Sequence, residues 1–369
     1  MNVLEKIAWK TRRAAGLARS AVENIVERPY SSFIVSSDSA GWVLDVEANG
    51  FMDICRSLGI KARVGDPAGR KHSCVHYLSQ FALDTHGKSL SGEGCRYSLA
   101  YFHGGPADLG FGELFATFAA LKDRFTKVHV SNSHIATACL EAGFTPEQVV
   151  TIPIGLNVDW FPPQTAEARR NMRERLNIPQ SAFVVGSFQK DGVGWGDGME
   201  PKLIKGPDVF VNVMARAQDK IPELFVLLSG PARGYVKSGL EKLGIPYVHT
   251  FPRDPREAAG LYQAIDLYVV ASRVEGGPKA ILESMATGVP LVTTNVGQAV
   301  DIVEHGKNAW LAGSEDVENL ADGVLTAHQN PAFFRSMKDT ARKTAETEDY
   351  LAQAPRWRES FFKGYVEGI

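Results

Sequence analysis

Short apolar runs alternate with amphipathic segments along most of this 369-residue chain, and this alternation constrains its fold more than any other feature. Runs typical of strands fall at 32–37, 61–65, 75–79, 96–103, 127–132 and 149–154, and again at 183–188, 224–230, 247–251, 267–272, 291–295 and 309–312. Many are almost entirely apolar, as is typical of strands buried on both faces of a parallel sheet. The repeated strand–helix units therefore predict an α/β fold with two doubly wound parallel sheets.

The chain is long enough for two domains, and Pro162 and Pro163 mark the end of the first set of strands. We predict an N-terminal domain over 1–163 and a C-terminal domain over 164–345, opened by a charged helix at 165–176. A final helix over 346–369 is rich in aromatic residues and is expected to pack back toward the N-terminal domain. Ligands of such folds bind outside the carboxyl ends of the strands, so the predicted site is the cleft between the two domains.

The composition is that of an ordinary globular protein, with 44% apolar residues, 22% charged residues and a net charge of −2. Bulk charge therefore predicts no nucleic-acid partner. The four cysteines form no CxxC pair and no histidine pattern completes a zinc site, so we expect isolated thiols and no bound metal. No apolar run reaches the roughly 18 residues of a membrane span, and we predict a cytoplasmic location.

Residues 1–28 are the segment whose charge suggests a surface partner. Their spacing is helical, with Leu4 and Ile7 on one side and Lys6, Arg12 and Arg13 among the rest. A basic amphipathic helix can lie on an anionic membrane. We therefore consider peripheral contact with the inner face of the membrane, beside the alternative of a helix that packs against its own domain.

The stretch 266–295 reads as strand, glycine turn, helix, glycine and strand. The residues at 276–278, Gly-Gly-Pro, permit a tight turn and a helix start, and the N–H groups at 279 and 280 are then suited to a phosphate. Glu275 precedes this helix and Glu283 lies about one and a half turns inside it. The two carboxylates are thus too far apart for one metal and fit two ends of a longer ligand. The alternative is a plain helix start in which Ser272 and Glu275 form a capping box.

This stretch resembles the E-x7-E motif of family 4 glycosyltransferases, which are retaining enzymes of the GT-B fold. The segment 288–306 resembles the downstream signature of the same family, and the resemblance covers most of residues 127–330. It implies two Rossmann-like domains that face a central cleft. It also implies that Glu283 holds the ribose of a nucleotide. The donor sugar and the diphosphate would be held by Glu275, Gly276, Gly277, Pro278 and Lys279.

A second glycine-rich segment, 186–208, follows a strand and carries Lys190, Lys202 and Lys205, point charges that can neutralise a diphosphate. Its alternating glycines do not match GxGxxG, which disfavours a dinucleotide dehydrogenase. The resemblance implies that Lys205, directly before a glycine, grips the diphosphate.

The family has an arginine after the strand glycine of this segment, whereas Ser187 stands there in this chain. We assign Lys190 to the missing contact. The glycines around Trp195 suggest a mobile flap.

In the first domain, His103 and two glycines end a predicted strand, and the resemblance implies that His103 contacts the reacting sugar. Gly41, after the first strand, resembles the glycine turn that meets the donor phosphate or the acceptor. The segments 131–134 and 152–157 also match the family. We interpret them mainly as the lining of the cleft and the approach to the hinge.

The predicted activity is the transfer of a sugar from a nucleoside-diphosphate sugar to an acceptor hydroxyl with retention, without a cofactor or a metal. Lys205, Lys190 and the helix start at 277–280 would stabilise the charge of the departing diphosphate, and His103 and Glu275 complete the predicted catalytic set. The predicted acceptor is a glycan or a lipid-linked saccharide of the bacterial cell surface, chosen by first-domain loops such as 87–95 and 104–114. Two alternatives stay open, a nucleotide-sugar 2-epimerase of the same fold and a sugar-nucleotide-binding protein without catalysis.

Overall fold

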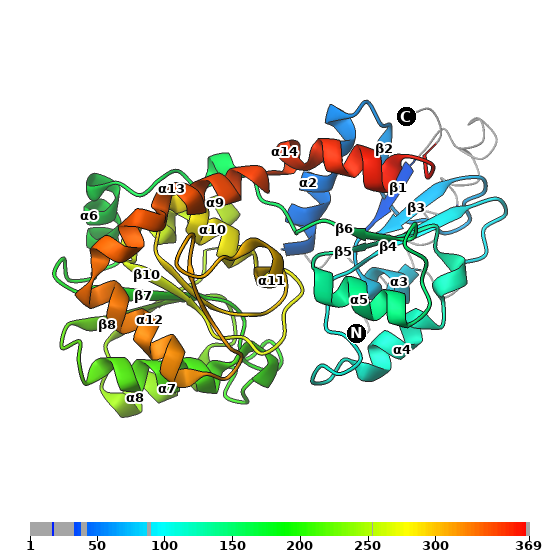
Figure 1. Ribbon diagram of the computed structural model, residues 1–369. Helices are drawn as coiled ribbons and strands as arrows, with labels where there is room; N and C mark the ends of the chain where they lie inside the picture. The colour runs from blue at the N-terminus through cyan, green and yellow to red at the C-terminus, as the bar shows by residue number, and fades with distance from the viewer. Residues whose placement is uncertain (1–16, 18–32, 38–42, 87–89, 253, 367–369) are drawn as a thin grey trace. The chain divides into compact units, whose positions relative to one another are not determined.

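The computed structural model describes residue 17 and residues 33–37, 43–86, 90–252 and 254–366. The chain divides into two compact units. Unit 1 contains the chain up to Gly155 and the segment from Tyr350 onward, and unit 2 contains Leu156–Asp349. Each unit has one six-stranded sheet with helices on both faces (Figure 1).

The sheet of unit 1 is entirely parallel, in the order β2-β1-β3-β4-β5-β6. Its strands are β1 (Phe33–Ser36), β2 (Ala62–Val64), β3 (Cys74–Tyr77), β4 (Arg96–Tyr101), β5 (Lys127–Val130) and β6 (Val149–Thr151). Its helices are α2 (Val43–Ser57), α3 (Gln80–His86), α4 (Gly112–Ala119), η1 (Lys122–Arg124), α5 (Ser133–Glu141), α14 (Tyr350–Arg356) and the π-helical turn η5 (Trp357–Phe362).

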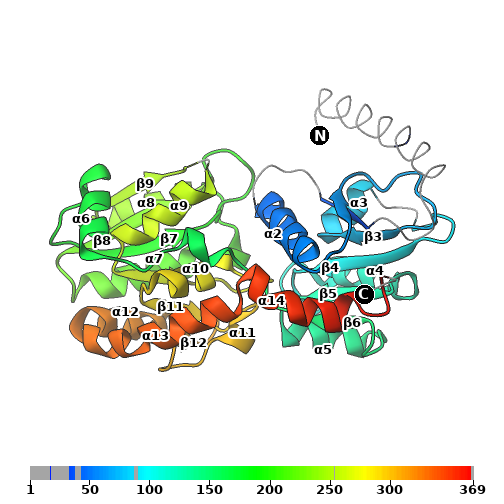
Figure 2. The same cartoon turned by 90° about the horizontal axis from the view of Figure 1, so that it is seen from above.

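Each face of this sheet has its own apolar core. On one face, α2 packs with α14 and η5. The ring centroids of Phe51, Trp357 and Phe361 lie between 5.0 and 6.1 Å apart. On the other face, α3, α4 and α5 cover the sheet (Figure 2). The final segment is therefore an integral part of unit 1, because its aromatic side chains complete one of the two cores.

Unit 2 repeats this architecture with a parallel sheet in the order β12-β11-β10-β7-β8-β9. Its strands are β7 (Phe183–Phe188), β8 (Leu224–Ser229), β9 (Tyr247–Thr250), β10 (Leu267–Val270), β11 (Leu291–Thr294) and β12 (Trp310–Ala312). Its helices are η2 (Val158–Trp160), α6 (Ala166–Arg175), η3 (Leu203–Lys205), α7 (Pro207–Gln218), α8 (Gly234–Leu243), α9 (Pro255–Leu261), η4 (Tyr262–Ala264), α10 (Lys279–Thr287), α11 (Ala299–Ile302), α12 (Val317–Gln329) and α13 (Pro331–Thr347). Helices α7, α8 and α12 cover one face, and α9, α10 and part of α13 cover the other (Figure 1).

The predicted α/β class is confirmed, because each of the twelve expected strands overlaps a strand of the structure. The division between the units, however, falls after Gly155 and not after Pro163. The reason is packing: Leu156 and Phe161 are buried in the core beside α9 and α10. The second division falls between Asp349 and Tyr350, four residues after the predicted one.

The strand order of unit 2 creates a switch point between β7 and β10, where the chain winds outward in opposite directions. Ligands of doubly wound sheets bind outside the carboxyl ends of the strands at such a point. The loop after β7 is the lysine- and glycine-rich segment, and the loop after β10 carries Glu275. Both predicted donor-binding segments therefore leave the sheet at its switch point.

Two predictions lie outside the described residues, namely the amphipathic helix at 1–28, of which residue 17 alone is described, and the turn that contains Gly41. Within the ranges that the structure describes, no helix is long and apolar enough to cross a membrane. The four cysteines are free thiols, three of them buried.

Candidate functional site

Lys205 and Glu275 form the centre of the site in unit 2. The Lys205 Nζ donates to Glu275 Oε2 over 2.5 Å, and the Ser272 hydroxyl donates to Glu275 Oε1 over 2.8 Å. The Glu275 side chain is only 10% exposed and that of Lys205 is 23% exposed. The carboxylate is thus held from both sides, next to a cation that retains access to solvent.

Hydrogen bonds bring together the loop after β7, which carries Lys205, and the loop after β10, which carries Glu275. The N–H groups of Arg273 and Val274 both donate to the carbonyl of Ile204. The Arg273 guanidinium makes a bidentate pair with Asp208 and also donates to the carbonyl of Leu203. These bonds hold the pKa of Asp208 below its usual range, with the guanidinium as the main cause. The η3 turn is therefore fixed to the end of β10, which places Lys205 beside Glu275.

Two glycines allow this close approach. Gly206 has a φ of +61°, and a Cβ built there would lie 1.9 Å from the carbonyl oxygen of Ala271. Gly297, from the downstream signature, has a φ of +53°, and a Cβ built there would lie 2.5 Å from the carbonyl oxygen of Gly276. Since a side chain at either position would displace the backbone of the site, both positions require glycine.

Helix α10 begins at Lys279, directly after the Gly-Gly-Pro turn from which a helix start was predicted. Pro278 is the N-cap of this helix. The positive end of the helix dipole therefore adjoins the turn formed by Gly276 and Gly277, as an anion-binding role requires. The capping-box alternative fails, because Ser272 lies six residues before the N-cap and bonds the Glu275 side chain instead.

Glu283 is held by a tyrosine that sequence reasoning missed. The hydroxyl of the buried Tyr262 donates to Glu283 Oε2 over 2.8 Å. Burial, together with the Glu283 charge, keeps the pKa of Tyr262 well above its usual value, so this hydroxyl stays protonated. Tyr262 precedes β10 by a few residues, and only the fold shows that it reaches α10.

The other two lysines of the segment belong to the same electrostatic neighbourhood. Burial lowers the pKa of Lys202, the positive charges of Lys205 and Lys190 act in the same direction, and Glu275 opposes them. The Lys190 ammonium lies 4.1 Å from the ring centroid of Trp195. Three cations from the loop after β7 and one carboxylate from the loop after β10 thus gather, an arrangement suited to a polyanion such as a diphosphate.

The glycine-rich loop is fastened to the turn after β8, which argues against the expected flap. The N–H groups of Gly234 and Tyr235 donate to the carbonyls of Asp197 and Gly198. A Cβ built on Gly198 would lie 2.2 Å from the carbonyl oxygen of Ala232. The backbones of the two segments are therefore in direct contact.

A buried arginine stands beneath the position where the family has one on the strand itself. Arg233 is fully buried, donates to the carbonyl and the hydroxyl of Ser187 and to the carbonyl of Ser229, and lies 2.9 Å from Asp191. Burial raises the pKa of Asp191, against the attraction of the guanidinium. Because the Arg233 side chain is fully buried, it anchors the loop, and the contact assigned to Lys190 stays a prediction.

In unit 1, His103 lies just beyond the carboxyl end of β4. Its ring packs edge-on against Phe81, with the ring centroids 5.0 Å apart, and at a tilt against Phe111, with the centroids 5.5 Å apart. The hydroxyl of Tyr101 donates to the carbonyl of Gly104 and thereby fixes the turn that follows. His103 is thus held at the carboxyl-terminal edge of its sheet, while its role toward the donor stays a prediction.

The segment 131–134 has a structural explanation. Asn132 is the N-cap of α5, and its side chain accepts from the N–H of Ile135 at 3.0 Å. This bond satisfies one amide of the helix start.

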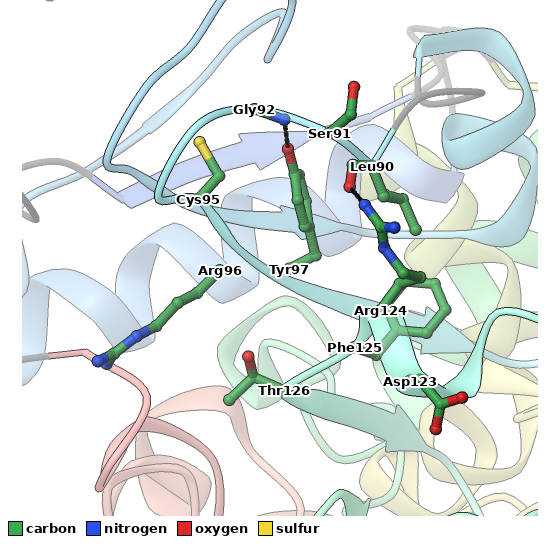
Figure 3. Close-up of a pocket in the computed structure, with 10 residues that line it drawn as sticks. All are labelled: Leu90, Ser91, Gly92, Cys95, Arg96, Tyr97, Asp123, Arg124, Phe125 and Thr126. Atoms are coloured by element: carbon green, nitrogen blue, oxygen red, sulfur yellow. Dashed lines mark hydrogen bonds between the residues drawn. The ribbon is translucent and has the colours of Figure 1, made fainter.

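A recess of about 460 Å³ opens at the opposite, amino-terminal edge of the unit 1 sheet (Figure 3). It is lined by Tyr97 and Arg124, among others, and the Tyr97 hydroxyl accepts from the N–H of Gly92. Its position away from the strand carboxyl ends separates it from the predicted site. Among the described residues, no group of three or more His, Cys, Asp or Glu side chains is placed to hold a metal.

The fold places the chain in a known structural class. It matches the crystal structure of Anabaena HepE in complex with UDP and glucose with a TM-score of 0.68 at 17% identity, over 89% of this chain and 98% of that one. It matches sucrose-phosphate synthase from Thermosynechococcus elongatus with a TM-score of 0.72 at 17% identity, over 90% of this chain and 98% of that one. The predicted GT-B class of two Rossmann-like α/β domains is therefore confirmed.

Sequence comparison adds a family match and named relatives to this structural similarity. Residues 200–344 match the model of the family described as glycosyl transferases group 1. A D-inositol 3-phosphate glycosyltransferase of Corynebacterium urealyticum is 30% identical over 213 residues, which are 53% of this chain and 47% of the relative. One from Corynebacterium jeikeium is 30% identical over 47% of this chain and 42% of the relative. The chain thus spans about half the length of the curated relatives it matches.

Proposed function

We propose that this protein transfers a sugar from a nucleoside-diphosphate sugar to an acceptor hydroxyl, with retention at the anomeric carbon and without a metal. The observation that carries the proposal is the Lys205–Glu275 pair at the switch point of unit 2, next to the start of α10. A similar fold binds UDP and UDP-glucose in HepE, which supports uridine diphosphate as the carrier.

The residues divide the work by charge. The ammonium groups of Lys205 and Lys190 and the start of α10 stabilise the negative charge that develops on the departing diphosphate. Glu283, positioned by Tyr262, accepts from the ribose hydroxyls. Glu275, held by Ser272 and Lys205, accepts from hydroxyls of the transferred sugar.

His103 contributes from unit 1, where it contacts the sugar near the reacting carbon. The departing phosphate oxygen takes the proton of the acceptor hydroxyl as the new glycosidic bond forms on the same face. This step requires no carboxylate nucleophile. Exclusion of water from the bound donor limits its hydrolysis.

The acceptor is proposed to be a glycan or a lipid-linked saccharide of the bacterial cell surface. The names of the corynebacterial relatives add D-inositol 3-phosphate as a second acceptor to be tried. Both acceptor classes offer a secondary hydroxyl to the same reaction. A transfer assay with each class in turn shows which one the protein glycosylates.

The first test is thermal unfolding with UDP, GDP, dTDP and ADP and their sugars. A ligand present at about 100 times its Kd adds about 2.7 kcal/mol of stability, which is a shift of several degrees. We expect a shift with uridine nucleotides that is lost in Glu283→Ala. No shift with any nucleotide would contradict the proposal.

The second test follows the chemistry by NMR. We expect consumption of the donor only when an acceptor is present and a product with the anomeric configuration of the donor. Inversion at C2 of the donor without an acceptor would favour the epimerase. Nucleotide binding without turnover of either kind would favour the binding protein.

Peripheral membrane contact through residues 1–28 is a separate proposal, supported by their basic amphipathic sequence. We expect the full chain to bind vesicles that contain phosphatidylglycerol at low salt and to dissociate at high salt. A chain that lacks residues 1–28 should not bind. Equal binding by both chains would overturn this proposal.

A further inference from the structure

An exposed indole stands next to the candidate donor site. Trp195 is 69% exposed, the largest exposed fraction among the large apolar side chains of the described residues. Its loop also exposes Val193, Met199 and Leu203, at 46%, 58% and 47%. Apolar surface of this kind, gathered on one loop, indicates a binding role more often than a single exposed side chain does.

The loop is built to hold its tip in one place. The N–H of Val193 donates to the carbonyl of Glu200, and that of Lys202 donates to the carbonyl of Asp191, so the loop closes like a hairpin. Its base is fixed by the buried Arg233–Asp191 pair. The indole is therefore presented by a braced loop, which lowers the conformational entropy that a ligand contact would cost.

Lys190 connects the Trp195 ring to the candidate donor site. The Lys190 ammonium lies 4.1 Å from the ring centroid of Trp195. The charges of Lys190, Lys205 and Glu275 all act on Lys202, so the four groups share one neighbourhood. Trp195 therefore adjoins Lys190, one of the cations that are proposed to hold the diphosphate.

The charge of the loop indicates what kind of ligand the ring takes. Lys190 and Lys202 are offset by Asp197 and Glu200, so the loop has no excess of positive charge for an anionic membrane. A pyranose ring suits this surface better. Its axial C–H groups pack on an aromatic face, while its peripheral hydroxyls reach charged side chains such as Asp197.

We propose that Trp195 is the platform on which a pyranose ring of the acceptor stacks, so that the acceptor is a saccharide and not a simple polyol phosphate. This inference rests on the proposed glycosyl transfer and names the class of its acceptor. Met199 is also exposed on this loop, but its sulfur packs close to Gly234 at the start of α8, and it offers no aromatic face. Met199 is therefore a suitable control.

The experiment uses the full-length protein, saturated with UDP, on a printed array of bacterial and synthetic glycans. Four proteins are compared: the wild type and the variants Trp195→Ala, Trp195→Phe and Met199→Ala. We expect the wild type to retain a defined set of glycans. Trp195→Ala should lose about tenfold in affinity for them, whereas Trp195→Phe, which keeps an aromatic face, and Met199→Ala should stay within threefold of the wild type.

A fluorescence readout tests the stacking itself. An indole that is 69% exposed emits at long wavelength, so a glycan selected on the array should shift the emission to shorter wavelength. The shift should be present in Met199→Ala and absent in Trp195→Phe, which keeps the other five of the six tryptophans but lacks the indole of the proposed platform. An equal shift in Trp195→Phe would overturn the platform.

Calorimetric titration with UDP separates the two levels of the proposal. If the wild type does not bind UDP, the proposed function itself fails. If UDP binds but no glycan does, or if Trp195→Ala and the wild type bind glycans equally, the platform alone is overturned. Binding to phosphatidylglycerol vesicles that is lost in both Trp195→Ala and Met199→Ala would instead assign the loop to a lipid surface and also overturn it.

Discussion

Lys205 and Glu275 lie 70 positions apart in the chain, yet their side chains meet at 2.5 Å at the ends of two neighbouring strands. The contact joins the most specific sequence motif of the chain to a lysine that is unremarkable in isolation. It also makes each residue dependent on the other, because a partly buried charge that loses its partner is costly.

Replacement of either residue should therefore impair turnover. We expect Glu275→Gln and Lys205→Met each to lower kcat/KM for the donor by at least about 100-fold, since each removes a charge from the region where the transition state develops charge. The double variant should lose much less than the product of the two single losses, because the residues act as a unit. Strictly multiplicative losses in steady-state assays would show that the pair does not act together.

The Tyr262 hydroxyl should tune nucleotide binding through Glu283. We expect Tyr262→Phe to weaken UDP binding about tenfold in calorimetry, because Glu283 loses the donor that orients it. Tyr247→Phe is the matched control, since the Tyr247 hydroxyl also donates to a carboxylate, that of Glu241 in α8, which is not part of the candidate site. Equal losses in both variants would indicate a general packing defect.

Gly206 should tolerate no side chain. Gly206→Ala places a methyl group against the carbonyl oxygen of Ala271, in addition to the strain of a left-handed residue, and we expect a loss of more than about 3 kcal/mol. Gly244 has a similar φ of +70° but open space around it, so Gly244→Ala should cost only about 1 to 2 kcal/mol. Denaturant unfolding of both variants measures the difference, and equal costs would refute the steric explanation.

Acid should destabilise unit 1 through two buried histidines. Burial lowers the pKa of His129 to about 4 and the pKa of His76 well below its usual value. Because both groups are neutral when folded and take up a proton when unfolded, stability is present above about pH 6.5 and is lost as the pH falls toward 4.

His129 alone should account for about 3 kcal/mol across this window, at about 1.4 kcal/mol for each pKa unit. Thermal unfolding between pH 7 and pH 4.5 tests this expectation. The variant His129→Gln, which keeps an amide donor for the carbonyl of Ile152, should flatten the pH dependence. An unchanged slope would exclude His129 as its source.

Local pattern was sufficient for much of this molecule. All twelve strands were predictable because most are short, buried apolar runs, and their length and flanking turn residues favour strands over helices. The position of Glu283 within α10 followed from the glycines and the proline that begin the helix. The charged helix predicted at 165–176 is confirmed as α6, where the hydroxyl of the N-cap residue Thr165 accepts from the N–H of Ala168.

Tertiary relationships were not predictable. Arg233 reaches Ser187 across 46 positions, and Tyr262 reaches Glu283 across 21, and neither distance follows a local period. The expected flap was an inference from glycine content. The glycines have a different role, because Gly192 and Gly198 allow the backbone of this loop to contact the backbone of Ala232.

The return of the final segment to unit 1 has a consequence for how the protein is made. Unit 2 is continuous in sequence, so a ribosome has delivered all of it before Tyr350 emerges. The core beside α2 still lacks Trp357, Phe361 and Phe362 at that moment. Unit 1 thus begins before unit 2 in the sequence but is completed after it. During synthesis its apolar core stays incomplete until α14 and η5 have been made.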